Sequence, residues 1–251
     1  MGEDRRRYGD TSDVILLGIF GAEVIRATLQ DKVAKEIVAH GLGRSHVVVL
    51  DALLKLRQVC CDPRLMKLAS ARLSNTSCKL DELLEMVGEM AAEGRRILLF
   101  SQFTSMLDLM KPTLDAAGIR YLAQRGDTVD RAAPVQRFEA SEVPLFLISL
   151  KAGGRGLHLT SADTVIHYDP WWNPAVEDQA SDRGHRIGQT KSVFVYKLIA
   201  ADTADERILE LQERKAALAS IAFGDEGSGL AAMDRDDIEF LFGTALRRLA
   251  A

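Results

Sequence analysis

Short, continuous apolar runs that alternate with helical segments constrain the fold of this chain more than any other feature. Continuous apolarity indicates strands that are buried on both faces of a sheet. Strands joined by helices are connected by right-handed crossovers, which align them in parallel. The sequence therefore predicts an α/β fold with a doubly wound, mostly parallel sheet. The clearest runs are Ile97-Leu98-Leu99-Phe100, Phe146-Leu147-Ile148, Val165-Ile166 and Val193-Phe194-Val195-Tyr196.

Helical patterns flank this region on both sides. Residues 21–41 and 47–62 are rich in helix formers and end at glycine or before proline, so the first sixty or so residues are expected to be wholly helical. A further helix begins near Lys79, another covers 206–222, and a short one covers 236–242. We predict a helical extension (1–78), an α/β lobe (79–224), and a linker with a C-terminal helix (225–251) that braces the lobe.

Composition excludes several classes of protein. With 251 residues, of which 47% are hydrophobic, the chain can bury one sizeable core. A net charge of −4 excludes a uniformly basic coat, so any contact with nucleic acid must come from a local patch. Three cysteines are too few for a disulfide framework. The apolar stretch 14–22 is too short for a membrane span and its acidic flanks argue against a signal peptide, so we expect a cytoplasmic protein.

Glycine and basic residues follow the second predicted strand, in the segment Ser149-Leu150-Lys151-Ala152-Gly153-Gly154-Arg155-Gly156. Glycines let backbone amides approach a phosphate closely, and a nearby lysine or arginine adds positive charge. A tight turn from strand to helix needs glycine for conformational reasons alone, so both interpretations stay open. The chain contains neither a P-loop of the form G-x-x-x-x-G-K-S/T nor a dinucleotide motif G-x-G-x-x-G.

The chain's two tryptophans, Trp171 and Trp172, stand side by side after the third predicted strand. Prolines on both sides fix a rigid turn, and Pro174 suits the first turn of the next helix. The pair is either a packing plug or a surface that contacts nucleic acid.

The helix predicted next contains the most informative residues. At about 100° per residue, Gln179, Arg183 and Arg186 fall on one stripe of the segment 179–189. Two arginines three positions apart repel one another unless an anion lies between them, and their planar groups suit phosphate oxygens. The alternative is a solvated face that Asp178 and Asp182 neutralise.

Other catalytic or metal-binding signatures are absent from the sequence. His158, His167 and His185 match no metal spacing, so we predict no metal site and assign these histidines structural or surface roles. No Ser-His-Asp order, nucleophile elbow or general-acid pair stands out.

Taken together, these segments resemble the second RecA-like lobe of the Swi/Snf family, DNA-dependent ATPases within helicase superfamily two. The resemblance covers about residues 31–222 and is strongest to bacterial members. The segments that carry it, in the family's order and spacing, are Leu56-Arg57-Gln58-Val59-Cys60, 97–103, 149–159, 169–174 and 179–189.

The resemblance implies an ATPase whose site is shared between two lobes. The first lobe would supply the P-loop and the acidic motif that holds Mg²⁺, and the second would supply arginine fingers to the γ-phosphate of ATP. Such a finger is worth on the order of 10³–10⁵ in rate. The implied residues are Arg183, Arg186 and the coupling residue Gln179 for catalysis, Gly153, Gly154 and Gly156 near the nucleotide, and Ser149, Lys151 and Trp172 for contact with the backbone of double-stranded DNA.

Three hypotheses follow. The first is the C-terminal half of a double-stranded DNA translocase at the bacterial nucleoid, inactive without a P-loop lobe in cis or trans. The second is a non-catalytic module that binds DNA or protein, motivated by departures from the family at Arg125, Arg155 and His158. The third, a small-molecule transferase, explains the strands but not the paired arginines.

Overall fold

The computed structural model describes residues 4–8, 12–18, 22–66, 77–153, 159–171, 174–182, 192–201, 203–221 and 235–242. The chain divides into two compact units. The first consists of Met1–Leu17 and Asn75–Ile199, and the second of Gly18–Ser74 and Ala200–Ala251.

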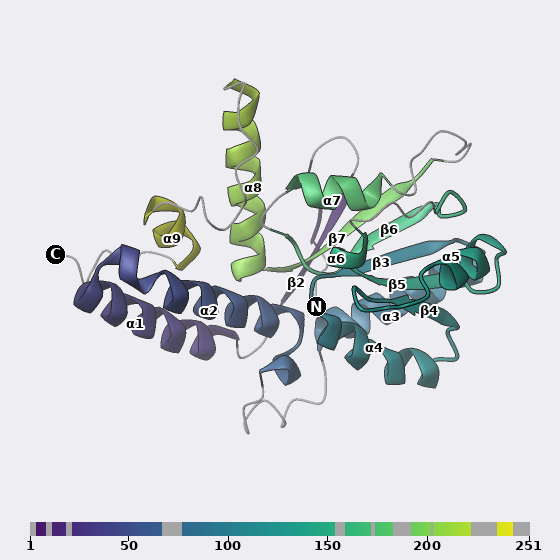
Figure 1. Cartoon of the computed structure of the whole chain (residues 1–251), viewed down its shortest axis with the longest axis horizontal. Helices are drawn as coiled ribbons and strands as arrows, with labels where there is room; N and C mark the ends of the chain where they lie inside the picture. Colours follow the sequence, from purple (N-terminus) through teal and green to yellow (C-terminus); the bar gives the residue numbers. More distant parts are fainter. Residues whose placement is uncertain are drawn as a thin grey trace. The chain divides into compact units, whose positions relative to one another are not determined.

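Five parallel strands form the main part of the sheet in the first unit (Figure 1). They lie in the order β7-β6-β3-β5-β4, which confirms the predicted doubly wound, mostly parallel sheet. From β3 at the centre the chain goes to the edge strand β4. It then returns through β5, next to β4, to β6 and β7 on the other side of β3. The strands are β3 (Ile97–Ser101), β4 (Tyr121–Gln124), β5 (Leu145–Ser149), β6 (Thr164–His167) and β7 (Phe194–Ala201).

Two short strands extend the sheet beyond β7, and here the prediction was wrong. β1 (Asp4–Tyr8) and β2 (Ser12–Gly18) pair antiparallel, with Arg6 opposite Val14, and β2 neighbours β7. The first sixty residues are therefore not wholly helical. The run Val14-Ile15-Leu16 is a short apolar segment with β-branched residues, the same kind of signal that marked the central strands.

Burial explains why the central strands read as continuous apolar runs. Every residue of β3, β5 and β6 is buried, because helices cover both faces of the sheet. β4, at the edge, alternates between buried and half-buried residues. Helices α3 (Cys78–Ala92) and α4 (Thr104–Ala116) pack on one face, and α5 (Ala132–Glu139), α6 (Leu150–Gly153) and α7 (Pro174–Ser181) lie on the other (Figure 1).

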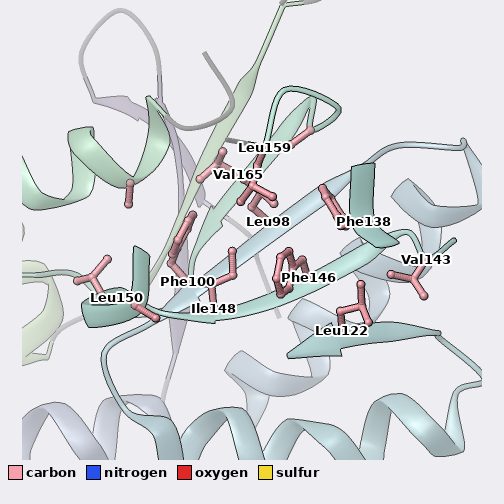
Figure 2. Close-up of a cluster of buried hydrophobic side chains, with 13 residues drawn as sticks. Leu98, Phe100, Leu122, Phe138, Val143, Phe146, Ile148, Leu150, Leu159 and Val165 are labelled. Carbon is pink, nitrogen blue, oxygen red and sulfur yellow. The ribbon is translucent and has the colours of Figure 1, made fainter. Parts of the chain in front are cut away.

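The core on the second of these faces supports the residues discussed below. Figure 2 shows its side chains between the strands and the covering helices, with the Phe138 and Phe146 rings 5.4 Å apart. The labelled members are Leu98, Phe100, Leu122, Phe138, Val143, Phe146, Ile148, Leu150, Leu159 and Val165.

Glycine ends two helices as the sequence predicted. Gly41 and Gly94 have φ values of 73° and 78°, in the left-handed region that glycine adopts without a Cβ clash. Gly94 follows α3, and its N–H donates to the Ala91 carbonyl. Gly41 lets the chain reverse direction between the first two helices of the second unit.

The second unit is helical. α1 packs along α2, α2 contacts α8, and α8 contacts α9, where the Arg207 guanidinium donates to the Leu241 carbonyl at 3.0 Å. α2 begins at Leu42, earlier than predicted. Among the described helices, none is both long and apolar enough to cross a bilayer. The helices are α1 (Ala22–His40), α2 (Leu42–Cys61), the 3₁₀ turn η1 (Pro63–Leu65), α8 (Ala204–Ile221) and α9 (Arg235–Phe242).

Candidate functional site

The carboxyl ends of β3, β5 and β6 meet at one edge of the sheet. Ser101, at the end of β3, is the register partner of Ser149 on β5, and Phe100 is the partner of His167 on β6. In doubly wound sheets ligands bind outside this edge, near the point where the strand order reverses. The structure thus brings together the described members of the segments that the sequence singled out.

Asp169 ties the turn after β6 to the turn after β3. Its carboxylate is buried and accepts the Gln102 N–H at 3.2 and 3.3 Å from its two oxygens. Next to it, the Tyr168 N–H donates to the Phe100 carbonyl at 3.0 Å. The sequence motif 169–174 contains Asp169 without indicating this role, and the position of Asp169 between a buried strand and a proline is the signal that could have predicted it.

Ser149 caps the short helix that follows β5. Its side chain is buried, and its hydroxyl accepts the Ala152 N–H at 3.3 Å, so the hydroxyl serves the turn itself. Lys151 is exposed, and Gly153 is the last residue of α6. The remaining predicted residues of this turn, Gly154 and Gly156, and the family departures Arg155 and His158 lie outside the described residues.

Trp171 is packed. Its side chain is half-buried against the core cluster of Figure 2, which favours the plug interpretation for this residue. The backbone N–H of Trp171 donates to the Glu177 carboxylate. Trp172 lies outside the described residues, so its DNA contact stays a prediction.

A buried ion pair lies behind this turn, and the sequence reasoning missed it. Glu177 on α7 is 1% exposed, and its Oε2 lies 2.8 Å from Nζ of Lys197 on β7. A helical wheel contained the signal, because Glu177 stands one turn before Ala180 and Ser181 on the packed side of the helix.

His167 joins the other end of α7 to the sheet. Its Nε2 lies 2.9 Å from the Ser181 hydroxyl, and its ring stacks on Phe100 with centroids 5.6 Å apart. Burial lowers the pKa of His167 to about 4; Lys197 adds to this effect and Glu177 opposes it. The imidazole is therefore neutral near pH 7, and its contacts lie with Ser181 and Phe100 inside the lobe. Within the described ranges no group of three or more His, Cys, Asp or Glu residues could hold a metal ion.

Gln179 faces away from this packed side and is exposed on α7. The helix ends at Ser181, and the Asp182 N–H closes a last turn onto the Asp178 carbonyl at 2.8 Å. Partial burial raises the pKa of Asp178; Lys197 opposes this shift, and the carboxylates Glu177 and Asp182 add to it. Arg183, Arg186 and His185 lie outside the described residues, so the arginine stripe stays a prediction.

The family departure Arg125 lies on the surface of the lobe, next to the buried residue Gln124 at the end of β4. Gln124 is fully buried, and in the described structure neither atom of its amide group has a hydrogen-bond partner. Arg125 is paired with Asp108, and its N–H donates to the Thr128 hydroxyl at 2.9 Å. Local contacts within the lobe therefore occupy Arg125.

Comparisons with known proteins cover the same region. A model described as the helicase conserved C-terminal domain matches residues 78–188. The putative ATP-dependent helicase/translocase YwqA of Bacillus subtilis is 37% identical over 203 residues, which cover 77% of this chain and 22% of that protein. The chain spans about a fifth of the length of two of the curated relatives it matches, 19% in one case and 22% in the other.

Solved structures from Sulfolobus solfataricus are similar over nearly the whole chain. The C-terminal domain of its SWI2/SNF2 ATPase has a TM-score of 0.71 and 25% identity, covering 92% of this chain and 96% of that one. The core of the same ATPase in complex with dsDNA has a TM-score of 0.72 and 27% identity, covering 92% of this chain and 49% of that one.

Proposed function

Because the chain belongs to the SWI2/SNF2 family, with residues 78–188 as its RecA-like helicase C-terminal domain, we propose that it is the arginine-finger lobe of an ATP-dependent double-stranded DNA translocase. Hydrolysis would require a P-loop lobe, in cis or trans, that also supplies Mg²⁺. The single observation that carries the proposal is the motif Asp182-Arg183-Gly184-His185-Arg186-Ile187-Gly188-Gln189, which follows α7.

The chemistry of phosphoryl transfer supports this assignment of Arg183 and Arg186. The reaction needs positioning and neutralisation of charge on the phosphate oxygens more than covalent chemistry. Guanidinium groups provide both, because they bind phosphate oxygens in a fixed planar geometry. Gln179, exposed on α7, is proposed to couple nucleotide state to DNA. Gly153, Gly154 and Gly156 are proposed to approach the nucleotide through their backbone amides.

Contact with DNA is supported by the Sulfolobus core, which was solved in complex with dsDNA. Contacts to phosphates give affinity without sequence preference, as a translocating motor requires. Lys151 is the strongest of the three proposed DNA contacts because it is exposed at the carboxyl edge. Ser149 is the weakest, because its buried hydroxyl already caps α6. Such a motor would work at the nucleoid, in the bacterial cytoplasm.

The test is reconstitution. We expect almost no phosphate release from ATP by the chain alone, and DNA-stimulated hydrolysis after addition of a separately made lobe with a P-loop and an acidic helicase motif. In that mixture, Arg183→Ala and Arg186→Ala should each lower turnover by on the order of 10³ or more. The matched control is Arg137→Ala, since Arg137 is exposed on α5 and pairs with Glu142 at 2.7 Å.

Two outcomes would contradict the proposal. Undiminished turnover in both finger variants would remove the catalytic role of the arginines. Tight, salt-dependent duplex binding by the chain alone, with no hydrolysis in any mixture, would instead favour the non-catalytic module.

A further inference from the structure

Glu177 connects three separate elements of the lobe. It lies in the first turn of α7, and its carboxylate accepts the N–H of Trp171 in the turn that precedes the helix. The same carboxylate pairs with Lys197 of β7 at 2.8 Å. Lys197 is itself fixed, because it is the register partner of His167 on β6.

Both charged groups of this ion pair are buried, so each needs the other to offset its lost hydration. Glu177 is 1% exposed, and the side chain of Lys197 is 14% exposed. A buried charge is tolerated only when partners compensate its lost hydration, so removal of one partner leaves the other strongly destabilised. The carboxylate therefore has one favourable position, between the Trp171 N–H and the Lys197 ammonium.

A second contact holds the other end of α7. Ser181, the last residue of the helix, bonds through its hydroxyl to the neutral imidazole of His167. The helix is thus tied to the sheet at both ends, and Gln179 projects from its exposed side between the two ties.

We propose that Glu177 is a positioning residue that locks the tryptophan turn to helix α7, so that the two respond to their ligands as one body. The inference rests on the proposed function, in which DNA contacts the tryptophan turn and ATP contacts the arginines that follow α7. Through the Glu177 carboxylate, a change in backbone position at Trp171 is transmitted to the start of the helix that leads to Arg183. Glu177 itself would touch neither ligand.

The tryptophans allow a test that needs no ATPase activity. Trp171 and Trp172 are the only two tryptophans in the sequence, so selectively excited tryptophan fluorescence of the chain reports on this turn alone. We expect Glu177→Ala to loosen the turn and raise the acrylamide quenching constant about twofold. Glu177→Gln should lie between Glu177→Ala and the wild type, because the amide keeps an acceptor but loses the charge. The control Glu85→Ala removes an exposed carboxylate from α3 and should match the wild type.

A pair of double variants keeps the test decisive if Glu177→Ala fails to fold. Both variants contain Lys197→Met, so neither leaves a buried charge unpaired. The variant with Glu177→Gln retains an acceptor for the Trp171 N–H, and the one with Glu177→Leu does not. Higher quenching in the leucine variant supports the lock. Equal quenching in the two, or wild-type quenching in both single Glu177 variants, would overturn it.

The reconstituted ATPase provides the functional readout. The ratio of DNA-stimulated to basal turnover should fall about tenfold in Glu177→Ala and stay unchanged in Glu85→Ala. An unchanged ratio in Glu177→Ala would refute the coupling role. If no lobe mixture hydrolyses ATP, the proposed function fails, whereas the fluorescence series still decides whether Glu177 fixes the turn.

Discussion

His167 should make the stability of the sheet unit depend on pH in a range where few other groups titrate. Its imidazole is 2% exposed, and burial lowers its pKa to about 4 from the ordinary value of 6.5. Between these two pH values the unfolded chain binds a proton that the folded chain does not. Acid therefore favours unfolding, and the stability that neutral His167 provides is complete above about pH 6.5 and is lost as the pH falls toward about 4.

The size of the effect follows from the two pKa values. Lowering the pH from 7 to 5 should remove about 2 kcal/mol of unfolding free energy through this one residue. The loss should continue to about 3 kcal/mol near pH 4 and then level off.

Urea denaturation followed by tryptophan fluorescence measures this quantity, because both tryptophans belong to the sheet unit. The glutamine in His167→Gln cannot become charged in this range. Between pH 7 and 5, the loss of unfolding free energy should therefore be about 2 kcal/mol smaller in this variant than in the wild type. Ser181→Ala should keep most of the wild-type pH dependence, since burial is the main cause of the lowered pKa and the hydrogen bond to Ser181 is not. Identical pH profiles for the wild type and His167→Gln would refute the reasoning.

Two further predictions concern Gln124 and Lys151. Gln124→Leu should raise the free energy of unfolding in urea by about 1–3 kcal/mol. Leucine removes a fully buried amide that has no hydrogen-bond partner in the described structure. A destabilised variant would indicate that a polar partner exists. Lys151→Ala should weaken duplex binding for all DNA sequences alike, measured by fluorescence anisotropy. The slope of log K against log salt should become shallower by about 1. The control Lys111→Ala on α4, where Lys111 pairs with Asp108, should leave the slope unchanged.

Local signals in the sequence were sufficient to predict the central strands and the glycines that end two helices. β3, β5 and β6 were predicted because a strand covered on both faces must be apolar throughout. Gly94 was predicted to close α3 because a left-handed residue at a helix end is most readily glycine. β2 contained a similar apolar run but was assigned to a helical region. Its partner β1 directly precedes it in the sequence, whereas its other neighbour, β7, lies far along the chain.

The candidate site shows the same division. The sequence alone identified the segments at the strand ends, the family that they resemble and the arginine motif. These features depend on residue types at fixed spacings. Only the tertiary structure decided that the Ser149 hydroxyl caps α6, that Trp171 packs on the core, and that the Glu177 carboxylate lies between the Trp171 N–H and Lys197. The Ser149 cap is a local contact over three residues. The packing of Trp171 and the contacts of Glu177 join separate elements, so they exist only once the sheet has set β6, α7 and β7 side by side.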